Sequence, residues 1–308
     1  MSWYGVRLVV AHEFRVRLRT GRWQWLFAAW AALVGCVAFS AYLAYQPSTD
    51  CANCADRVGP GMFGLLMFFV LTLVLLISPA LTAQSINGDR ERGTLALLQV
   101  TTLSATDIAL GKLFAGWLVG LAALGVTLPA VAWTVVEGVG ALRAVTVVLV
   151  VGLLIGVVCA VSLGLSAALA RGTTSTMMSY LTVFALLVGT PLVFALSVVM
   201  ISGRDGASRE DLVWGTLAPN PFVIIADAAP QPVVRRGSDD DMLHQLSTSV
   251  RELRRPPGAR DFDRRVIDPP VWPYGLGFDL LLGAGGLALA RHRLRTPART
   301  VPSGVRVA

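Results

Sequence analysis

Apolar residues in this chain gather in long runs with few or no charges, and these runs predict its fold. A helix rises about 1.5 Å per residue, and the hydrocarbon core of a bilayer is about 30 Å thick, so roughly 20 apolar residues cross it. Six runs are long enough: 23–45, 61–83, 108–136, 144–170, 176–200 and 272–290. We therefore expect an all-α polytopic membrane protein with six transmembrane helices, the fifth kinked at Pro191.

Composition agrees with a membrane protein. Of the 308 residues, 55% are hydrophobic and only 15% are charged, whereas soluble domains carry about 25% charged residues. All basic residues except Lys112 are arginines, which indicates a GC-rich bacterial genome. The net charge of +7 would by itself also fit a nucleic-acid-binding protein, so the distribution of the basic residues decides between the two.

The basic residues lie mainly on one side of the predicted membrane. If the N-terminus is cytoplasmic, the short outer loops hold only Arg57 and Arg143. The cytoplasmic segments then hold the following residues: Arg7, Arg15, Arg17, Arg19, Arg22, Arg90, Arg92, Lys112, Arg171, Arg291, Arg293, Arg295, Arg299 and Arg306. Positive charge in short loops marks the cytoplasmic side and attracts anionic lipid. We expect a bacterial plasma-membrane protein with both termini in the cytoplasm and no role in nucleic-acid binding.

Residues 1–22 interleave apolar side chains with arginines ahead of the first run. This pattern predicts an amphipathic helix that lies in the membrane interface, and a merely basic tail is the alternative. A cleaved signal peptide is not expected, because the apolar run that follows is too long. The candidate functional residues of this helix are Arg7, Glu13, Phe14 and Arg15.

A dense charged cluster separates the second and third runs, in a cytoplasmic segment over residues 84–107. Asp89 to Arg92 form the cluster, and Ser104 and Asp107 stand three apart, as in a capping box that starts a helix. The order is therefore a short surface helix, a break and a new span. We interpret this segment as a docking surface for another protein, and a solvated polar loop is the alternative.

A long outer loop, residues 201–271, precedes the last span. Its apolar part, 212–230, contains Pro219 and Pro221 and is predicted to be re-entrant or interfacial. A seventh span is the alternative, but its prolines would leave backbone groups unpaired in lipid, and it would put the Arg-rich tail, 291–308, outside. The rest of the loop, from residue 234 to residue 268, is polar and expected to be mobile.

Two further features are candidate sites. Cys51 and Cys54 lie in the first outer loop and could form a disulfide, remain free or contribute half of a metal site. Asp279 lies about seven residues into the sixth span, where an ionisable residue is a functional candidate. Alternatively, the span begins later, or Asp279 caps a neighbouring helix.

No cofactor site is predicted in the chain. Gly111-Lys112 does not belong to a phosphate-binding loop, because Thr106 and Leu113 occupy positions that require Gly and Ser or Thr. The three histidines, at positions 12, 244 and 292, are scattered over different segments, so no catalytic set is suggested. The chain is expected to be a non-enzyme, and any ATP would be hydrolysed by a partner.

Several of these motifs together resemble the membrane-spanning subunit of type-2 ABC exporters. They are Asp89-Arg90-Glu91-Arg92-Gly93-Thr94-Leu95, Leu97-Leu98, Leu103-Ser104, Gly111-Lys112, His12-Glu13-Phe14 and Pro219-Asn220-Pro221-Phe222. The six spans with both ends inside add to the resemblance, which covers most of the chain. Thr102 stands where the family has a proline, which loosens the expected turn.

The resemblance implies a separate cytoplasmic ATPase, with its own ATP and Mg²⁺, that docks on the N-terminal helix and the coupling loop. The coupling residues would be Asp89, Arg90, Glu91, Arg92, Gly93, Thr94, Leu97 and Leu98. It also implies a second permease subunit, either a copy of this chain or a paralogue. The alternatives are a stand-alone secondary transporter or channel that uses Asp279, and a non-transporting membrane scaffold. The sequence does not indicate the cargo.

Overall fold

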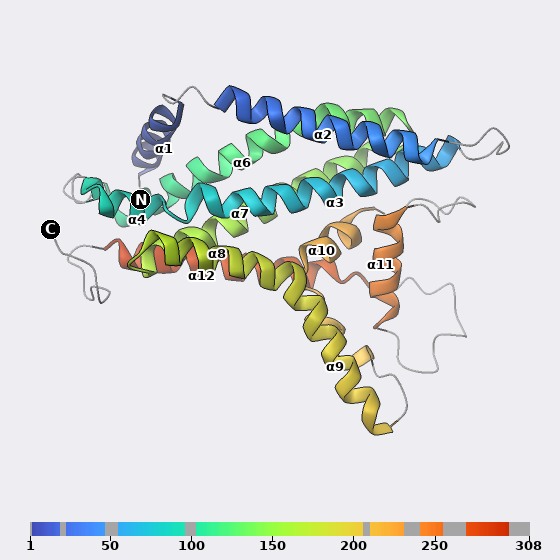
Figure 1. Cartoon of the computed structure of the whole chain (residues 1–308). Coiled ribbons are helices and arrows are strands. Elements are labelled where there is room, and N and C mark those ends of the chain that lie inside the picture. The colour runs from blue at the N-terminus through green and yellow to red at the C-terminus, as the bar shows by residue number, and fades with distance from the viewer. Residues whose placement is uncertain are drawn as a thin grey trace.

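The computed structural model describes residues 2–18, 23–46, 55–95, 103–205, 210–230, 241–254 and 269–295, and these residues form helices without a β-strand (Figure 1). The α-helices are α1 (Trp3–Leu18), α2 (Trp23–Tyr45), α3 (Ala55–Thr82), α4 (Ser85–Glu91), α6 (Ala105–Val136), α7 (Ala141–Ala168), α8 (Gly172–Phe184), α9 (Thr190–Asp205), α10 (Pro221–Ala228), α11 (Met242–Glu252) and α12 (Trp272–Arg293). A π-helical turn, Ala185–Gly189, joins α8 to α9, and two 3₁₀ turns, Glu210–Leu212 and Trp214–Thr216, precede α10.

The prediction of six spans is confirmed. Among the described residues, six helices are long and apolar enough to cross a membrane: α2, α3 with α4, α6, α7, the continuous α8–α9 helix, and α12. The protein is therefore an all-α polytopic membrane protein. The predicted N-terminal helix is present as α1, and the predicted kink at Pro191 falls directly after the π-helical turn.

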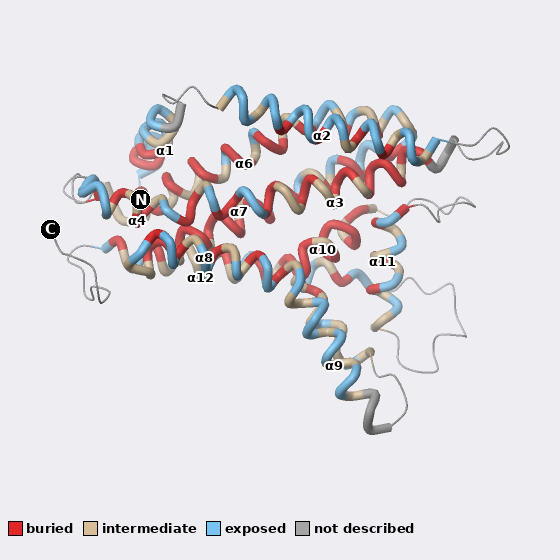
Figure 2. The backbone as a smooth tube through the Cα atoms, in the orientation of Figure 1, coloured by how far each residue is buried: buried red, intermediate tan, exposed pale blue. Residues whose placement is uncertain are grey.

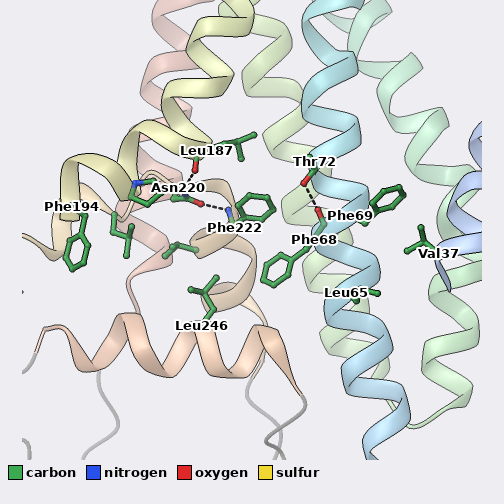
Figure 3. Close-up of a pocket in the computed structure, with 13 residues that line it drawn as sticks. Val37, Leu65, Phe68, Phe69, Thr72, Leu187, Phe194, Asn220, Phe222 and Leu246 are labelled. Carbon is green, nitrogen blue, oxygen red and sulfur yellow. Dashed lines mark hydrogen bonds between the residues drawn. The ribbon is translucent and has the colours of Figure 1, made fainter. Parts of the chain in front are cut away.

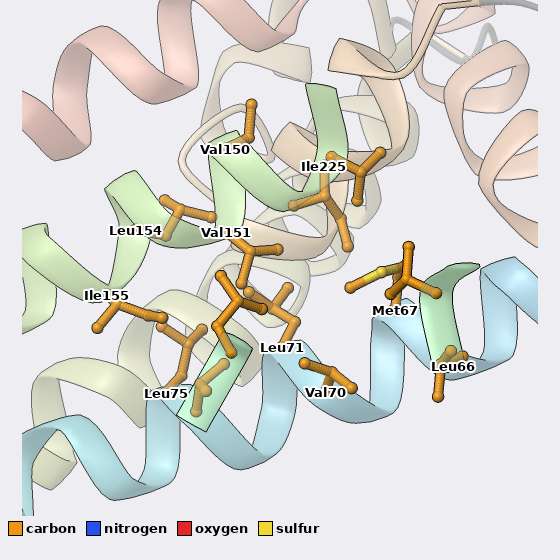
Figure 4. Packing of buried hydrophobic residues seen from close by; sticks show 14 of the residues in the cluster. Leu66, Met67, Val70, Leu71, Leu75, Val150, Val151, Leu154, Ile155 and Ile225 are labelled. Carbon is orange, nitrogen blue, oxygen red and sulfur yellow. The ribbon is translucent and has the colours of Figure 1, made fainter. Parts of the chain in front are cut away.

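The centre of the bundle is formed by α3 and α7, which bury far more of their surface than the peripheral spans α2 and α8–α9 (Figure 2). Leu71 of α3, Val151 of α7 and Ile225 of α10 point into one apolar cluster (Figure 4). Since lipid is as apolar as these side chains, close packing selects which helix faces meet.

The last span packs along α7 through glycines. A Cβ on Gly164 would lie 2.5 Å from the carbonyl oxygen of Gly286, and a Cβ on Gly286 would lie 2.6 Å from that of Ala160. The two backbones therefore approach more closely than any larger residue allows. By contrast, a Cβ on Gly277 or Gly285 would have no atom of another element within 4 Å.

The two ends of the bundle differ, and we name each by a helix. The α4 end holds α1, α4, the start of α6 and the end of α12. Side chains of α4, α6, α7 and α12 share a second apolar cluster there, which includes Ile86 and Leu294. The α11 end holds α10, α11 and the start of α12 (Figure 1). These two ends carry different polar networks.

At the α11 end, α10 is buried in the bundle and does not span it. Its eight residues reach only about 12 Å at 1.5 Å per residue, so the alternative of a seventh span is wrong. Ile224 and Ile225 of α10 join the main core. Asp227, which is 2% exposed, accepts hydrogen bonds from the backbone N–H groups of Val271 (2.6 Å) and Trp272 (2.8 Å), from Ser247, and from Arg251, which also pairs with it.

The helix α11 was not predicted, because the whole stretch from residue 234 to residue 268 was expected to be polar and mobile. Within residues 241–254 of this stretch, Met242–Glu252 are helical instead, with Leu243 and Val250 buried on one face. The expectation was wrong for this part because a short amphipathic helix needs few apolar residues. Arg143 of α7 anchors it through two bonds to Asp241 (2.5 and 2.9 Å), and the rest of the stretch lies outside the described residues.

The α7–α12 contact predicts a difference between two neighbouring glycines. We expect Gly286→Ala to lower the free energy of unfolding by about 1–3 kcal/mol, because its Cβ meets backbone that cannot rotate away. Gly285→Ala, with nothing within 4 Å, should be neutral or stabilising. The midpoint of thermal unfolding of the purified protein measures both, and equal midpoints would contradict the packing.

Candidate functional site

The α4 end is built from the start of α6, where the predicted capping box is confirmed. The Ser104 hydroxyl accepts from the backbone N–H of Asp107 (3.2 Å), and the Asp107 carboxylate accepts from that of Ser104 (3.2 Å). The second carboxylate oxygen accepts from the backbone N–H of Ser2 (2.9 Å). Asp107, which completes the capping box of α6, therefore also binds the backbone of Ser2, just before α1.

Lys112, the chain's single lysine, forms the centre of the site two turns into α6. Its ammonium group lies 2.6 Å from the carboxylate of Glu13 in α1 and 2.5 Å from that of Asp89 in α4, and it donates to the carbonyl of Ser85 (3.2 Å). The Lys112 side chain is 1% exposed. We call Lys112, Glu13 and Asp89 the Lys112 bridge. It joins α1, α4 and α6, and a charge buried this deeply requires such partners.

The helix α4 is further bonded to α7 and α8. The hydroxyl of Ser166 in α7 accepts from the backbone N–H groups of Ile86 and Asn87, both at 3.2 Å. The hydroxyl of Ser175 in α8 donates to the carbonyl of Ala83 (2.7 Å), just before α4. These bonds satisfy free backbone groups around the start of α4, so this short helix has a fixed position against three spans.

The predicted coupling residues separate into two groups. Asp89 points inward to the Lys112 bridge, and the Arg90 guanidinium donates to Asn87 (2.8 Å) and to the carbonyl of Leu169 in the chain after α7 (3.3 Å). By contrast, Glu91 and Arg92 are exposed, although Arg92 also reaches Asp89 (3.1 Å).

The chain turns away at the end of α4. Gly93 ends the helix with a left-handed backbone (φ 70°), a conformation that favours glycine, and Thr94 is exposed while its hydroxyl donates to the carbonyl of Asp89 (3.2 Å). Leu97 and Leu98 lie outside the described residues. Among the predicted coupling residues that the structure describes, Glu91 to Thr94 are the exposed ones.

The N-terminal helix α1 packs its narrow buried face on α6. Val6 and Val9 are buried, and a Cβ on Gly111 would lie 2.5 Å from that of Val9, so the glycine permits the contact. Of the predicted residues, Glu13 joins the Lys112 bridge and Phe14 is partly buried, whereas Arg7 and Arg15 are exposed. Exposed Trp3 and Tyr4 share the outward side with these arginines, as in helices at a membrane interface.

Sequence reasoning missed that Lys112 joins these helices. It treated Lys112 as a span boundary and as part of a family motif, and it treated Asp89 as a surface charge. One signal was available, since a lysine inside a predicted span requires a partner. Four acids, Glu13, Asp89, Glu91 and Asp107, lay on the same predicted side, and no spacing rule singled out Glu13 and Asp89 as the partners of Lys112.

Asp279, the predicted intramembrane candidate, is buried in α12. It is 1% exposed, and neither carboxylate oxygen has a hydrogen-bond partner in the described part of the chain. The alternatives of a later span start and of a helix cap are both wrong, because α12 begins at Trp272 and the carboxylate caps nothing. Cys51 and Cys54 lie outside the described residues. No group of His, Cys, Asp or Glu among the described residues could hold a metal.

An apolar cavity of about 780 Å³ lies towards the α11 end (Figure 3). Its walls come from α2, α3, the bend between α8 and α9, the segment leading into α10, and α11. Among the described residues, Thr72 and Asn220 are the polar residues of its lining, and the Thr72 hydroxyl is already bonded to the carbonyl of Phe68 (2.8 Å). The cavity is separate from the Lys112 bridge.

Comparison with known protein families gives one match. The family described as "ABC-2 family transporter protein" matches residues 7–206, more than half of the chain. The matched range includes all three members of the Lys112 bridge and runs from α1 to the end of α9. No curated protein matches the sequence.

The Lys112 bridge predicts a large effect of removing its cation. We expect Lys112→Met to lower the free energy of unfolding by about 3–5 kcal/mol, because two carboxylates are left without their buried partner. Adding Glu13→Gln and Asp89→Asn should restore most of that loss. Chemical or thermal unfolding in detergent provides the measurement, and a triple variant no more stable than Lys112→Met would contradict the account.

Two buried aspartates predict opposite behaviour. Asp227→Asn should destabilise the protein by about 3–5 kcal/mol, because it loses charged bonds to Arg251 and two backbone N–H groups. Asp279→Asn should change stability by less than about 0.5 kcal/mol, because Asp279 makes no hydrogen bond that could be lost. Unfolding midpoints of the two variants, measured side by side, check this difference. A similar loss in both would show that Asp279 has partners.

Proposed function

The chain belongs to the ABC-2 family of transporter proteins, and we propose that it is the membrane-spanning permease subunit of an ATP-driven exporter in a bacterial plasma membrane. A separate ATPase subunit would bind ATP and Mg²⁺, since the sequence of this chain contains no phosphate-binding loop. The α4 end would face the cytoplasm together with both termini, in keeping with the arginines around it.

The Lys112 bridge is the observation that carries this proposal. A protein that pushes on the exposed end of α4 also pushes on α6 and α1, because Lys112 of α6 pairs with Asp89 of α4 and with Glu13 of α1. Coupling between sites requires a physical element that both sites bias. The bridge, together with the bonds from Ser166 and Ser175, supplies such an element at the end of four spans.

The exposed residues beside the bridge fit a docking surface. Glu91 and Arg92 give charges of both signs at the tip of α4, and Arg7 and Arg15 add positive charge on α1. Charges of both signs fix the register and orientation of a protein partner more than they raise its affinity. The inward residues Asp89 and Arg90 would instead hold the surface in shape.

A second permease subunit, either a copy of this chain or a paralogue, is part of the proposal. The α8–α9 span supports it, because only 6% of its most apolar window is buried within the chain, against 61% for α3 and α7. Much of the surface of this span is therefore left for lipid or for another subunit. The ATPase would move two such subunits between inward-facing and outward-facing states.

Co-purification from mild detergent tests this function. We expect an ATPase to co-purify with the native chain, and the amount recovered to fall at least tenfold with Glu91→Ala combined with Arg92→Ala. The matched control is Arg291→Ala combined with Arg295→Ala, which removes exposed charges at the same end of the bundle. The control should retain the ATPase. If no ATPase accompanies the native chain under any condition, the proposed function fails.

A stand-alone carrier that uses Asp279 is the competing function, favoured by the unpartnered carboxylate inside a span. Asp279→Asn distinguishes the two in vesicles. The exporter account expects ATP-dependent transport to survive the substitution, whereas the carrier account expects transport to be lost and to need no ATPase.

A further inference from the structure

The α8–α9 span changes its backbone hydrogen bonding in the membrane. The N–H of Thr190 donates to the carbonyl of Ala185, five residues earlier, and Pro191 has no N–H to donate. The carbonyls of Leu186 and Leu187 therefore lose the donors that residues 190 and 191 of a regular helix would supply. Water is absent from the hydrocarbon region, so these carbonyls need another donor.

Asn220 supplies that donor from a distant part of the chain. Its side-chain nitrogen lies 3.1 Å from the carbonyl oxygen of Leu187 (Figure 3) and 3.1 Å from that of Leu186. It also lies 2.9 Å from the hydroxyl of Thr190, which itself donates to the carbonyl of Leu186 (2.8 Å). Asn220 is 3% exposed. The side-chain amide of Asn220 therefore finds acceptors at the π-helical turn. A regular helix would offer fewer, because most of its backbone carbonyls already accept bonds from N–H groups of the same helix.

Asn220 is itself held in place by the α11 end. Its side-chain oxygen accepts from the N–H of Phe222 (2.9 Å) and so caps α10. The helix α10 is fixed in turn by Asp227, which binds the start of α12 and Arg251 of α11. The amide therefore extends from a fixed element to the π-helical turn of the α8–α9 span.

The π-helical turn coincides with a bend. In Figure 1, α9 leaves the line of α8 and points away from the bundle. Leu187, Pro191 and Phe194 at this bend form one wall of the apolar cavity, and Asn220 belongs to the same lining. On the opposite wall Phe68 meets Phe222 edge to face at 5.3 Å. The position of the bend therefore sets the width of the cavity.

We propose that Asn220 is a positioning residue that holds the α8–α9 span in its bent form and thereby keeps the cavity beside α3 open. Without this amide, the N–H of Thr190 is free to shift from the carbonyl of Ala185 to that of Leu186, as in a regular helix, which favours a straighter helix. This inference concerns the chain alone, so it stands or falls independently of the proposed ATPase.

Double electron–electron resonance spectroscopy, which measures the distance between two spin labels, tests the proposal. Spin labels are placed at exposed Val199 of α9 and exposed Leu149 of α7, in a background without Cys36, Cys51, Cys54 and Cys159. Labelled protein is diluted with unlabelled protein before reconstitution into nanodiscs, so that only distances within one chain are observed. We expect Asn220→Leu to shift or broaden the distance distribution, whereas an unchanged distribution would overturn the proposal.

Pro191→Ala separates positioning from simple stabilisation, because it returns a backbone N–H to the bend. Asn220→Leu should also lower the unfolding temperature. Adding Pro191→Ala should recover at least half of that decrease, while the distance distribution stays altered. If the double variant regains the native distances, Asn220 does not set the bend and the proposal fails. Thr72→Val, on the opposite wall of the cavity, is the control and should leave the distances unchanged. If this control shifts the distances as Asn220→Leu does, the shift is not specific to Asn220 and the proposal fails.

Discussion

A buried ammonium group must be neutralised by nearby acids, and this requirement organises the α4 end. Lys112 of α6 pairs with Glu13 of α1 and Asp89 of α4, so that three elements distant in sequence are joined in one unit. Removing Lys112 would leave the two carboxylates without their buried cation, which costs several kcal/mol. The short helix α4 could hardly be stable alone in water, and the bridge and the bonds to α7 and α8 give it a fixed position.

At the α11 end, polar side chains instead pair backbone groups that lie away from water. Asp227 accepts the free N–H groups at the start of α12, Asp241 caps α11, and Asn220 pairs the carbonyls at the bend. Each is a short polar side chain that completes an irregular stretch of backbone. The molecule therefore has a lysine-centred charge network at one end. At the other end, two aspartates that pair with arginines also cap backbone groups, and the apolar core of α3 and α7 joins the two ends.

Local patterns were readable from the sequence, and long-range pairs were not. The apolar runs gave the six spans and Ser104 with Asp107 gave the start of α6, because each depends on neighbouring residues. The bridge was missed because Glu13 lies 99 residues from Lys112, and no spacing rule connects them. The inward direction of Asp89 and the ordered helix α11 both depend on what packs beside them. The bend at Pro191 was predicted, but its partner Asn220 was not.

The central claim is that α4, α1 and α6 form one cytoplasmic unit through which an ATPase moves the spans. A cryo-electron-microscopy structure of the chain purified with its ATPase, held by a non-hydrolysable ATP analogue, tests it most directly. The account predicts that the ATPase contacts Glu91 to Thr94 and the exposed side of α1, with the Lys112 bridge intact. An ATPase bound elsewhere, or a bridge broken while α4 remains docked, would contradict it.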